Sequence, residues 1–416
     1  MNTDNFYQLL KKEVEKLQEL GIAKGEEIVI DGFTKETTPK AIIKGKKYYI
    51  FNSNDYLGLR FSKQLKKAES LASDKFGTGP GAVRFICGTL KIHSQLEEEI
   101  AKFHQKEAGM IFSSAFAANQ GVIFPLIIGQ RKNTLVNDNV LVVSDELNHR
   151  SIIDAIRLAK LPKENKAIFK HLDSRHLEEI IKDASGKFDR VLIVTDGVFS
   201  MLGEVQDLKS IKKIKDKYQN QFKNGILIIV DDAHGVGVLG KKGRGSEEYC
   251  QSEVDVLIGT FGKAFGTDGG YVVSKKAVID YLKESSATYI YSNNLTPATS
   301  AASLSALKIA QTKKGEFLRK KLQDNINFFK QKAHFLKIPL ASDSNHPIQP
   351  ILIGDSLKTK KIVKELLKKG FLTTAISYPV VPSGKDEIRI QLCANHNYWA
   401  IENLLKILYD LIKKSN

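Results

Sequence analysis

Residues 226–232 read ILIIVDD, a run of five apolar residues followed by two carboxylates. Apolar runs of this length are typical of strands covered on both faces, as in parallel sheets. Helix-like segments such as HLEEIIKDA at 176–184 separate the strand-like ones. This alternation predicts an α/β fold with a mostly parallel sheet. Three further segments share the strand pattern: VLVVSD at 140–145, VLIVTD at 191–196 and VLIGTFGK at 256–263.

The ends of these four segments are polar, which bears on where a ligand would bind. In open α/β sheets, ligands bind outside the carboxyl ends of the strands. Any strand must leave a sheet through a polar loop, so one such end alone would mean little. Four chemically rich ends in succession favour one shared site. They are Ser144–Asp145, Thr195–Asp196, Asp231–Asp232, and Thr260 with Lys263.

The pattern changes near residue 300, where a long helical stretch leads into short strands around 348–354 and 387–393 and a last helix at 398–413. We therefore expect three segments, with boundaries soft by several residues. We expect the N-terminal segment to join the small domain or to cross to a neighbouring subunit. Its amphipathic start, with Tyr7, Leu10 and Val14, predicts a helix packed on the body or on a partner subunit. The segments are an N-terminal segment at 1–55, a large α/β domain at 56–300 and a small α+β domain at 301–416.

Composition and charge exclude several classes of protein. The chain has 416 residues and a net charge of +16, but its lysines are spread along the sequence and alternate with glutamates. Solvated helix faces explain this pattern better than a nucleic-acid surface does. An excess of positive charge would also attract an anionic substrate such as coenzyme A. The longest apolar runs are strand-sized, so no membrane span is expected.

The cysteines and the N-terminus bear on the compartment. Cys87, Cys250 and Cys393 are scattered, odd in number and without the spacing of a metal site. No apolar export signal begins the chain. We expect packing thiols, no metal and a cytoplasmic protein.

Lys263 is the first candidate catalytic residue. It follows an apolar strand in TFGKAFG, where small neighbours leave its amine room for a ligand. A lysine at a strand end is more often a solvated surface residue, but a buried one can become a Schiff-base nucleophile. Asp231 favours the second interpretation, because a carboxylate there could keep a pyridinium nitrogen protonated, as pyridoxal phosphate (PLP) chemistry requires. His234 could bond the phenolic oxygen of the same ring.

Two further segments have both structural and functional interpretations. SSAFAANQGVI at 113–123 could bind a phosphate at a helix N-terminus, or be an ordinary capped helix. His149 could stack on a pyridine face, or merely cap the helix starting near Ser151. We interpret Ser94 and Glu97 as a structural capping box. The glycine-rich FGTGPGAVRF is interpreted as a loop rather than a dinucleotide fingerprint, because Pro80 interrupts it.

Together these motifs resemble the α-oxoamine synthases, fold-type I PLP enzymes, from about residue 54 to residue 396. Within that family, RFICGT, TDGVFSM, YSNNL and YPVVPSGKDEIRIQ are most similar to glycine C-acetyltransferase. SSAFAANQG and GTDGGY depart from its pattern, which leaves the acyl-CoA chain length open. The motifs in family order are NDYLGL, GAVRFICGT, HSQLEEEIAKF, DELNHRSIIDAIRL, TDGVFSMLGEV, VDDAHGVGVLG, GRGS and TFGKAFGTDGGY.

The resemblance implies a role for each matching residue. Lys263 matches the Schiff-base lysine, Asp231 and His234 the contacts to the ring nitrogen and phenolic oxygen, and His149 the ring-stacking histidine that also contacts substrate. Asn54 and Arg389 match residues that bind the substrate carboxylate. Three pairs of residues match the family's contacts to the cofactor phosphate. They are Ala115 and Phe116 through their backbone, Ser200 and Thr260 through their side chains, and Ser292 and Asn293 from a second subunit.

The implied activity is condensation of glycine with acetyl-CoA by a homodimer with shared active sites, giving 2-amino-3-oxobutanoate and CoA in threonine and glycine metabolism. Alternatives within the family are serine palmitoyltransferase, 8-amino-7-oxononanoate synthase and 5-aminolevulinate synthase. An aminotransferase would share Lys263 and Asp231 but would not need RFICGT. A non-catalytic partner subunit is less favoured, because such subunits typically lack the lysine.

Overall fold

The chain divides into two compact units in a computed structural model, which describes residues 3–20, 23, 27–129, 133–378 and 380–415. The larger unit is Asn54–Asp324, and the smaller unit joins Met1–Ser53 to Asn325–Asn416. The N-terminal segment thus groups with the C-terminal part of the chain. Residue 301, where we expected the small domain to begin, lies in α11 (Pro297–Ala310). This helix stays with the larger unit because it packs on two helices of that unit, α2 (Lys63–Phe76) and α3 (Lys91–His104).

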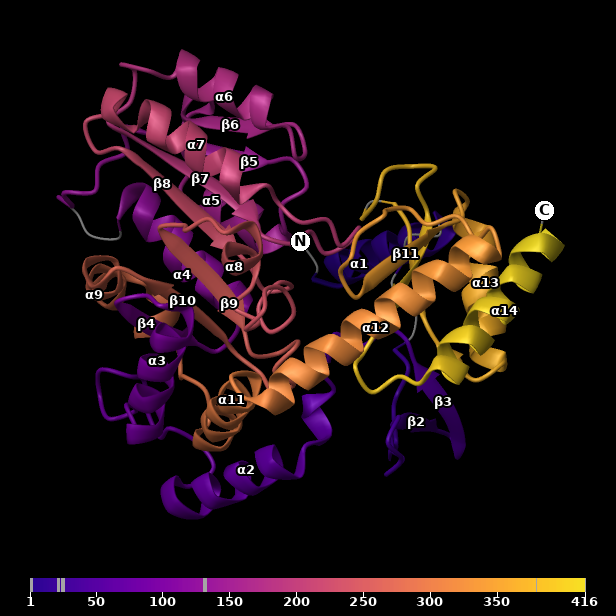
Figure 1. Cartoon of the computed structure of the whole chain (residues 1–416). Coiled ribbons are helices and arrows are strands. Elements are labelled where there is room, and N and C mark those ends of the chain that lie inside the picture. Colours follow the sequence, from indigo (N-terminus) through magenta and orange to yellow (C-terminus); the bar gives the residue numbers. More distant parts are fainter. Residues whose placement is uncertain (1–2, 21–22, 24–26, 130–132, 379, 416) are drawn as a thin grey trace. The chain divides into compact units, whose positions relative to one another are not determined.

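The larger unit is built on a seven-stranded sheet in the order β4-β10-β9-β8-β7-β5-β6 (Figure 1). The strands from β9 to β6 in this order run parallel, whereas β10 is antiparallel to both of its neighbours. The predicted α/β fold is confirmed. The strands are β4 (Ala108–Phe112), β5 (Val140–Asp145), β6 (Lys166–Phe169), β7 (Arg190–Asp196), β8 (Ile226–Asp231), β9 (Val256–Thr260) and β10 (Gly270–Ser274).

Every residue of β5, β7 and β9 is buried, which explains why these strands read as continuous apolar runs. Helices of the larger unit cover the sheet. Its other helices are α4 (Ala115–Ile128), α5 (Arg150–Leu158), α6 (Ser174–Asp183), α7 (Leu208–Tyr218), α8 (Ser246–Cys250), α9 (Lys276–Ser285) and α10 (Ala287–Ile290), with short 3-10 turns at Leu59–Phe61, Lys163–Asn165 and Gln219–Gln221.

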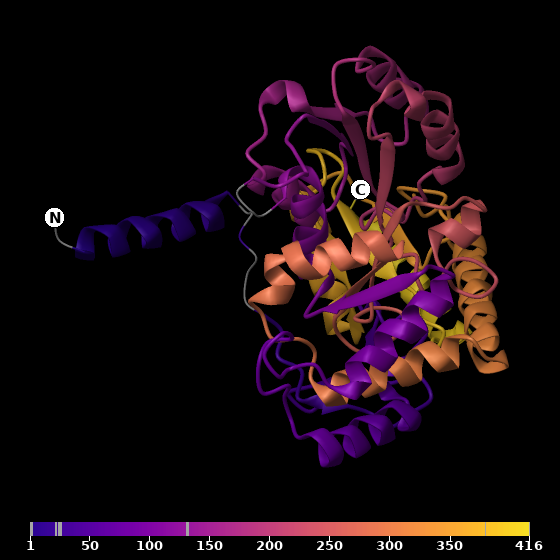
Figure 2. The same ribbon diagram turned by 90° about the vertical axis from the view of Figure 1, so that its left-hand side faces the viewer.

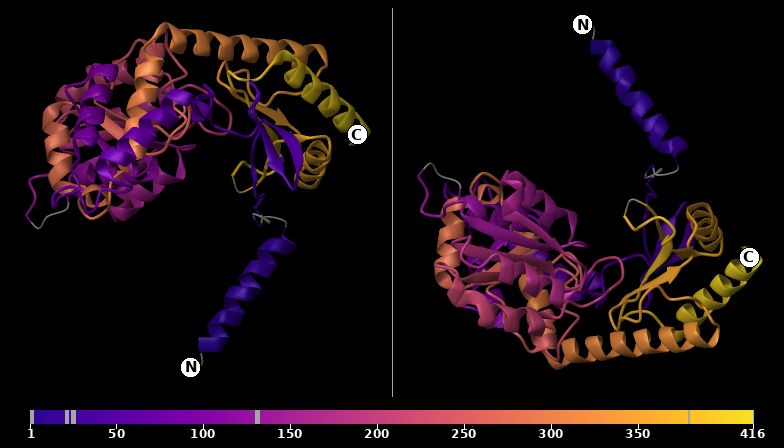
Figure 3. Two further views of the ribbon diagram at one scale, coloured as in Figure 1. Left: turned by 90° about the horizontal axis from the view of Figure 1, so that it is seen from below. Right: turned by 90° about the horizontal axis from the view of Figure 1, so that it is seen from above.

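The smaller unit contains two sheets (Figure 3). One has the order β1-β2-β3-β12 and the other the order β11-β14-β13. β12 pairs in parallel with β3, so backbone hydrogen bonds tie the N-terminal segment to the C-terminal part. The elements are β1 (Gly32–Phe33), β2 (Lys40–Ile43), β3 (Lys46–Ile50), β11 (Ile348–Leu352), α13 (Ser356–Lys368), β12 (Phe371–Leu372), β13 (Thr374–Ile376), β14 (Glu387–Gln391), α14 (Tyr398–Ser415) and α12 (Lys313–Phe335), which crosses the boundary between the units.

The N-terminal helix α1 (Thr3–Glu19) forms as predicted and is drawn in indigo in Figure 2. None of its residues is buried, and Tyr7 and Val14 are 62% and 53% exposed. The prediction that this apolar stripe packs on the body of its own chain is therefore wrong. Packing on a partner subunit stays a prediction. Among the described helices, none combines the length and apolar character that crossing a membrane requires.

Glu97 does not form the predicted capping box. Ser94 lies inside α3, which begins at Lys91, so it is not at the helix N-cap. The Glu97 carboxylate instead accepts two hydrogen bonds from the Arg84 guanidinium, at 3.1 and 3.0 Å. Pairing Glu97 with the buried Arg84 stabilises the protein more than capping the helix would. An unpaired charge in the interior is very costly, whereas an uncapped helix end is not.

We expect Arg84→Met to destabilise the protein by about 3–5 kcal/mol, because it leaves the Glu97 carboxylate buried without a counter-charge. Both side chains are less than one-tenth exposed. Equilibrium urea unfolding measures the effect. Arg150→Ala is the control, because Arg150 pairs with Asp154 at the surface, where such pairs contribute about 0–1 kcal/mol. Equal losses in the two variants would contradict the interpretation.

Candidate active site

The carboxyl ends of β5, β7 and β8 place three carboxylates at one edge of the sheet. Asp196 and Asp231 are direct partners in the β7–β8 register, and Asp145 ends the strand on the other side of β7. All three are at most 5% exposed. Burial raises the pKa of Asp196 well above its ordinary range, and the neighbouring Asp231 raises it further. The predicted shared edge is present in the structure.

Lys263 follows β9 at the same edge and is half-buried. Its positive charge lowers the pKa values of both His149 and Asp196. The loop is held by Thr260, whose hydroxyl donates to the Gly269 carbonyl at 2.7 Å and accepts from the Gly262 N–H at 3.1 Å. We expected the Thr260 side chain to contact a phosphate, but its hydroxyl hydrogen bonds to a backbone carbonyl of the same loop.

His149 caps α5, and its backbone N–H donates to the Asp196 carboxylate at 2.8 Å. Its Nδ1 lies 2.7 Å from the Ser151 hydroxyl and also accepts the Ser151 backbone N–H. The residue is exposed by surface area, yet the protein around it desolvates the ring enough to lower its pKa. Lys263 lowers this pKa further and Asp231 opposes the shift. A neutral imidazole is suited to stacking on an aromatic ring.

The N-terminus of α4 provides backbone donors beside the sheet. Ala115 and Phe116 are its first two residues, and Ser114 caps it by accepting the Ala117 N–H at 3.0 Å. Backbone N–H groups in the first turn of a helix bind anions such as phosphate. β10 begins very close to this turn: a Cβ at Gly270 would lie 2.5 Å from the Ser114 carbonyl oxygen. Glycine at position 270 therefore lets the helix N-terminus approach the sheet.

His234 joins the same edge from the loop after β8. Its Nδ1 lies 2.8 Å from the hydroxyl of Tyr56, which is fully buried. The same hydroxyl lies 3.2 Å from the side-chain oxygen of Asn54, a predicted substrate contact. Tyr56 thus connects the histidine predicted to contact the cofactor to the asparagine predicted to contact the substrate.

Among the described residues of the larger unit, no hydrogen bond joins Ser200, Ser292 or Asn293 to this cluster. Ser200 is half-buried in the loop between Val198 and Val205. Ser292 and Asn293 precede α11, where the Ser292 hydroxyl donates to the Asn293 carbonyl at 3.3 Å. Arg389 lies on β14 in the smaller unit. The roles of these residues stay predictions.

Three residues that touch the site were not among the predicted ones. Tyr56 contacts His234, and Asn119 contacts Asp231 at 2.5 Å. His171 bridges two carboxylates, with Nδ1 2.9 Å from Asp145 and Nε2 3.0 Å from Glu204. Of the three, only Asn119 left a signal in the sequence: it and the adjacent Gln120 are the two amides in an otherwise apolar or small-residue stretch of helix.

His171 makes the stability of the protein depend on pH. Burial lowers its pKa, but hydrogen bonds to Asp145 and Glu204 raise it to about 9, above the ordinary value of 6.5. The folded state therefore holds this proton more tightly than the unfolded chain does. Its contribution to stability is complete below pH 6.5 and is lost as the pH rises through about 9.

We expect the free energy of unfolding of the wild type to fall more steeply between pH 6.5 and 9.5 than that of His171→Asn, which has no proton to lose. Urea denaturation at a series of pH values measures both curves. His176→Asn serves as a control for the loss of an imidazole on α6. Parallel curves for the wild type and His171→Asn would show that His171 is not the group responsible.

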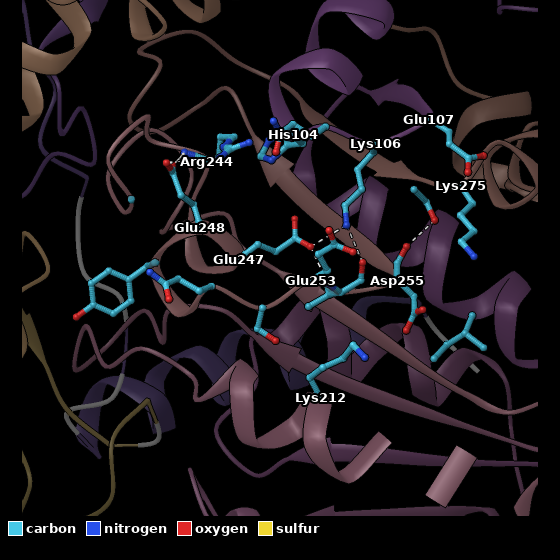
Figure 4. Close-up of a pocket in the computed structure, with 18 of the residues that line it drawn as sticks. His104, Lys106, Glu107, Lys212, Arg244, Glu247, Glu248, Glu253, Asp255 and Lys275 are labelled. Carbon is cyan, nitrogen blue, oxygen red and sulfur yellow. Dashed lines mark hydrogen bonds and ion pairs between the residues drawn. The ribbon is translucent and has the colours of Figure 1, made fainter. Parts of the chain in front are cut away.

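A cavity of about 1100 Å³ lies near the opposite ends of the parallel strands (Figure 4). Its lining includes Asp255, which directly precedes β9, and Leu227, near the start of β8. Ion pairs within the protein cross its walls, such as Lys106 with Glu247 at 2.8 Å. None of the predicted site residues lines this cavity. We therefore assign the chemistry to the edge that carries Asp231 and Lys263.

The groups at that edge fit PLP. Asp231 is a buried carboxylate for the ring nitrogen, Lys263 an amine for the aldehyde, and His149 a neutral imidazole for the ring face. The first turn of α4, with Gly270 beside it, offers backbone N–H groups to a phosphate.

Comparison with known proteins gives the same result. The family model for aminotransferase class I and II matches residues 46–408. An 8-amino-7-oxononanoate synthase of Petrotoga mobilis is 40% identical over 396 residues, or 94% of each chain. The 2-amino-3-ketobutyrate coenzyme A ligase of Escherichia coli is 38% identical over 395 residues, which cover 94% of this chain and 93% of the relative.

Solved structures agree with the family match. Serine palmitoyltransferase of Sphingomonas wittichii is similar, with a TM-score of 0.88 at 25% identity, over 100% of this chain and 99% of that one. A variant of SPT solved with PLP has a TM-score of 0.87 at 25% identity, over 99% of each chain. The cofactor of this protein is therefore PLP. The chain belongs to the aminotransferase class I and II family and is an α-oxoamine synthase within it.

Proposed function

We propose that this enzyme condenses glycine with acetyl-CoA to give 2-amino-3-oxobutanoate and CoA. The observation that carries the chemistry is the position of Lys263 just after β9, the strand that pairs with β8 where β8 ends at Asp231. The choice of substrates is supported by the RFICGT and YPVVPSGKDEIRIQ segments and by the E. coli relative named 2-amino-3-ketobutyrate coenzyme A ligase.

Each residue has a defined task in this reaction. PLP, when bound, supplies an electron sink for the negative charge that develops on the Cα atom of glycine. The Lys263 amine is placed to accept the Cα proton as a general base. Arg389 offers a planar pair of donors to the glycine carboxylate. A bond then forms between Cα and the acetyl carbonyl carbon while the C–S bond breaks, and the sulfur leaves with CoA.

Asp231 and His149 act on the electrostatics of the site. Asp231 would hold the ring nitrogen of bound PLP and keep it protonated, which is the chemistry that an electron sink requires. The neutral His149 ring offers a flat face without adding a second positive charge. Asp196, whose pKa is raised by burial, holds the His149 backbone rather than competing for the ring.

A second candidate is formation of 8-amino-7-oxononanoate, which the 40% identity to the Petrotoga mobilis synthase favours. Counting the carbons in that product shows that it requires alanine, a seven-carbon dicarboxylic acyl-CoA and loss of carbon dioxide. The two reactions thus differ in amino acid, in acyl chain and in the fate of the carboxylate.

A competition experiment separates the two candidates. The enzyme is given glycine and alanine together with acetyl-CoA and pimeloyl-CoA, and product mass and carbon dioxide release are measured. We expect the glycine–acetyl product with its carboxylate retained. A methylene contributes only about 1–3 kcal/mol to discrimination, so some activity with propionyl-CoA is consistent with this. A dominant decarboxylated product from alanine would overturn the acetyltransferase proposal and leave the PLP assignment intact.

We also propose a homodimer in which Ser292 and Asn293 complete the partner's phosphate site. Mixing Lys263→Ala subunits with Ser292→Ala/Asn293→Ala subunits is expected to restore partial activity, because one of the two hybrid sites is intact. Activity is measured after subunit exchange, with mass analysis to show that mixed dimers formed. Mixed dimers without activity would mean that each chain builds its own site.

A further inference from the structure

Asn119 links two catalytic residues through one buried amide. It lies on α4 and is 1% exposed. Its Nδ2 is 2.5 Å from the Asp231 Oδ2 and 2.9 Å from the Ser151 Oγ. Ser151, on α5, is fully buried and lies 2.7 Å from the His149 Nδ1. A continuous chain of hydrogen bonds therefore runs from Asp231 through Asn119 and Ser151 to His149.

The direction of these hydrogen bonds is fixed by their chemistry. An ionised carboxylate only accepts, so the amide must present its NH₂ group to Asp231. That group has two hydrogens, and the contacts use one for Asp231 and one for Ser151. The amide oxygen is left buried with no hydrogen-bond partner among the described residues. Leaving a buried acceptor without a partner costs free energy. The amide keeps this orientation because its NH₂ group donates both of its hydrogens.

The same chain sets the tautomer of His149. Because the Ser151 oxygen accepts from Asn119, its own hydrogen is free to be donated to the His149 Nδ1. The Ser151 backbone N–H also points to that nitrogen, at 3.3 Å. With Nδ1 accepting, the neutral imidazole carries its hydrogen on Nε2. One amide thus fixes both the carboxylate predicted to contact the ring nitrogen and the imidazole predicted to cover the ring.

We propose that Asn119 is a positioning residue that fixes the orientation of the Asp231 carboxylate and, through Ser151, holds His149 in the Nε2–H form. This inference rests on the proposed function, because it takes Asp231 as the partner of the ring nitrogen. Asn119 acts through Asp231 and His149 rather than on the substrate itself.

An aspartate at position 119 distinguishes this role from simple space filling. Aspartate has nearly the same shape as asparagine, so a packing role would tolerate Asn119→Asp better than Asn119→Ala. A positioning role predicts the reverse order. Two carboxylates this close must share a proton, so the pair carries a single negative charge and Asp231 loses the fixed amide donor that orients it. We expect Asn119→Ala to weaken PLP binding roughly 10- to 100-fold, as loss of a hydrogen bond to a charged group does, and Asn119→Asp to weaken it at least as much.

The measurements are the dissociation constant of PLP, the absorption spectrum of the bound cofactor, and kcat and KM separately. Gln120→Ala is the matched control, because Gln120 is the half-buried neighbour of Asn119 on the same helix. Circular dichroism shows whether each variant folds. Ser151→Ala is the second variant: it keeps the contact to Asp231, so PLP affinity should stay near wild type while kcat falls. Near-normal PLP binding in Asn119→Asp would overturn the inference.

A double variant separates failure of the inference from failure of the proposed function. If Asn119 acts through Asp231, Asn119→Ala should change PLP affinity less than about twofold in an Asp231→Asn background, which is within the error of additivity. If the double variant instead loses PLP affinity by the product of the two single-variant factors, the coupling of Asn119 to Asp231 is refuted and the proposed function is not. If Asp231→Asn by itself leaves PLP binding and turnover unchanged, the assignment of Asp231 fails and the inference fails with it.

Discussion

Replacing Lys263 with alanine is expected to lower turnover by at least roughly 10²–10⁴-fold, the range found when a general base is lost. The real loss should lie at the upper end, because the same amine is also the proposed attachment point for the cofactor. The position of Lys263 just after β9, next to the strand that ends at Asp231, gives this expectation its structural basis. Steady-state kinetics with glycine and acetyl-CoA measure the effect.

Lys275→Ala is the control for removing a lysine away from the site, because Lys275 is exposed directly after β10, at the opposite end of the sheet from Lys263. It should keep normal activity. A chemical test complements the kinetics: borohydride reduction of the wild type should attach the mass of the cofactor to the peptide that contains Lys263. A label on another lysine would refute the assignment even if Lys263→Ala were inactive.

The second large effect is expected from Asp231→Asn. An amide cannot balance a protonated ring nitrogen, so the developing negative charge loses its stabilisation. The loss should be about 3–4 kcal/mol, or roughly 10²–10³-fold in rate. PLP should still bind, because the contacts predicted from α4 and Lys263 remain. Turnover at saturating cofactor measures this change separately from affinity.

Asp154→Asn is a suitable control, since Asp154 pairs with Arg150 on the surface of α5. Its turnover should not change. A near-normal rate for Asp231→Asn would mean that another group, such as the neighbouring Asp196, carries the role. The buried Asp232 is a poor candidate, because its carboxylate accepts the Ser246 N–H at 2.8 Å and holds the following loop.

The sheet could be predicted from the sequence because its central strands are buried on both faces. β5, β7, β8 and β9 lie where the apolar runs were, and their polar ends meet as expected. β10 was not predicted, since its residues GYVVS follow the loop of Lys263 and resemble a continuation of it. Its antiparallel direction depends on pairing with β4, whose residues lie more than 150 positions earlier.

The site was predictable where a residue type by itself suggests a reaction, and not where the role depends on a distant neighbour. Lys263 and Asp231 stand at strand ends and carry recognisable chemistry. Tyr56 looks like a core aromatic until His234, 178 positions away, is seen beside its hydroxyl. Glu97 matched a local capping pattern, but Arg84 offered a stronger partner once both were buried. Long-range partners of this kind leave no local pattern.

The crowding of acids at the sheet edge has a consequence for producing this protein. Asp145 is balanced by His171, but Asp196 and Asp231 are buried side by side, and their repulsion destabilises the cofactor-free chain. The proposed contact of a cationic ring nitrogen with Asp231 would relieve part of that repulsion, and any ligand that binds only the folded state shifts the folding equilibrium towards it. The yield of intact protein in an expression host should therefore follow the supply of vitamin B6 in the growth medium.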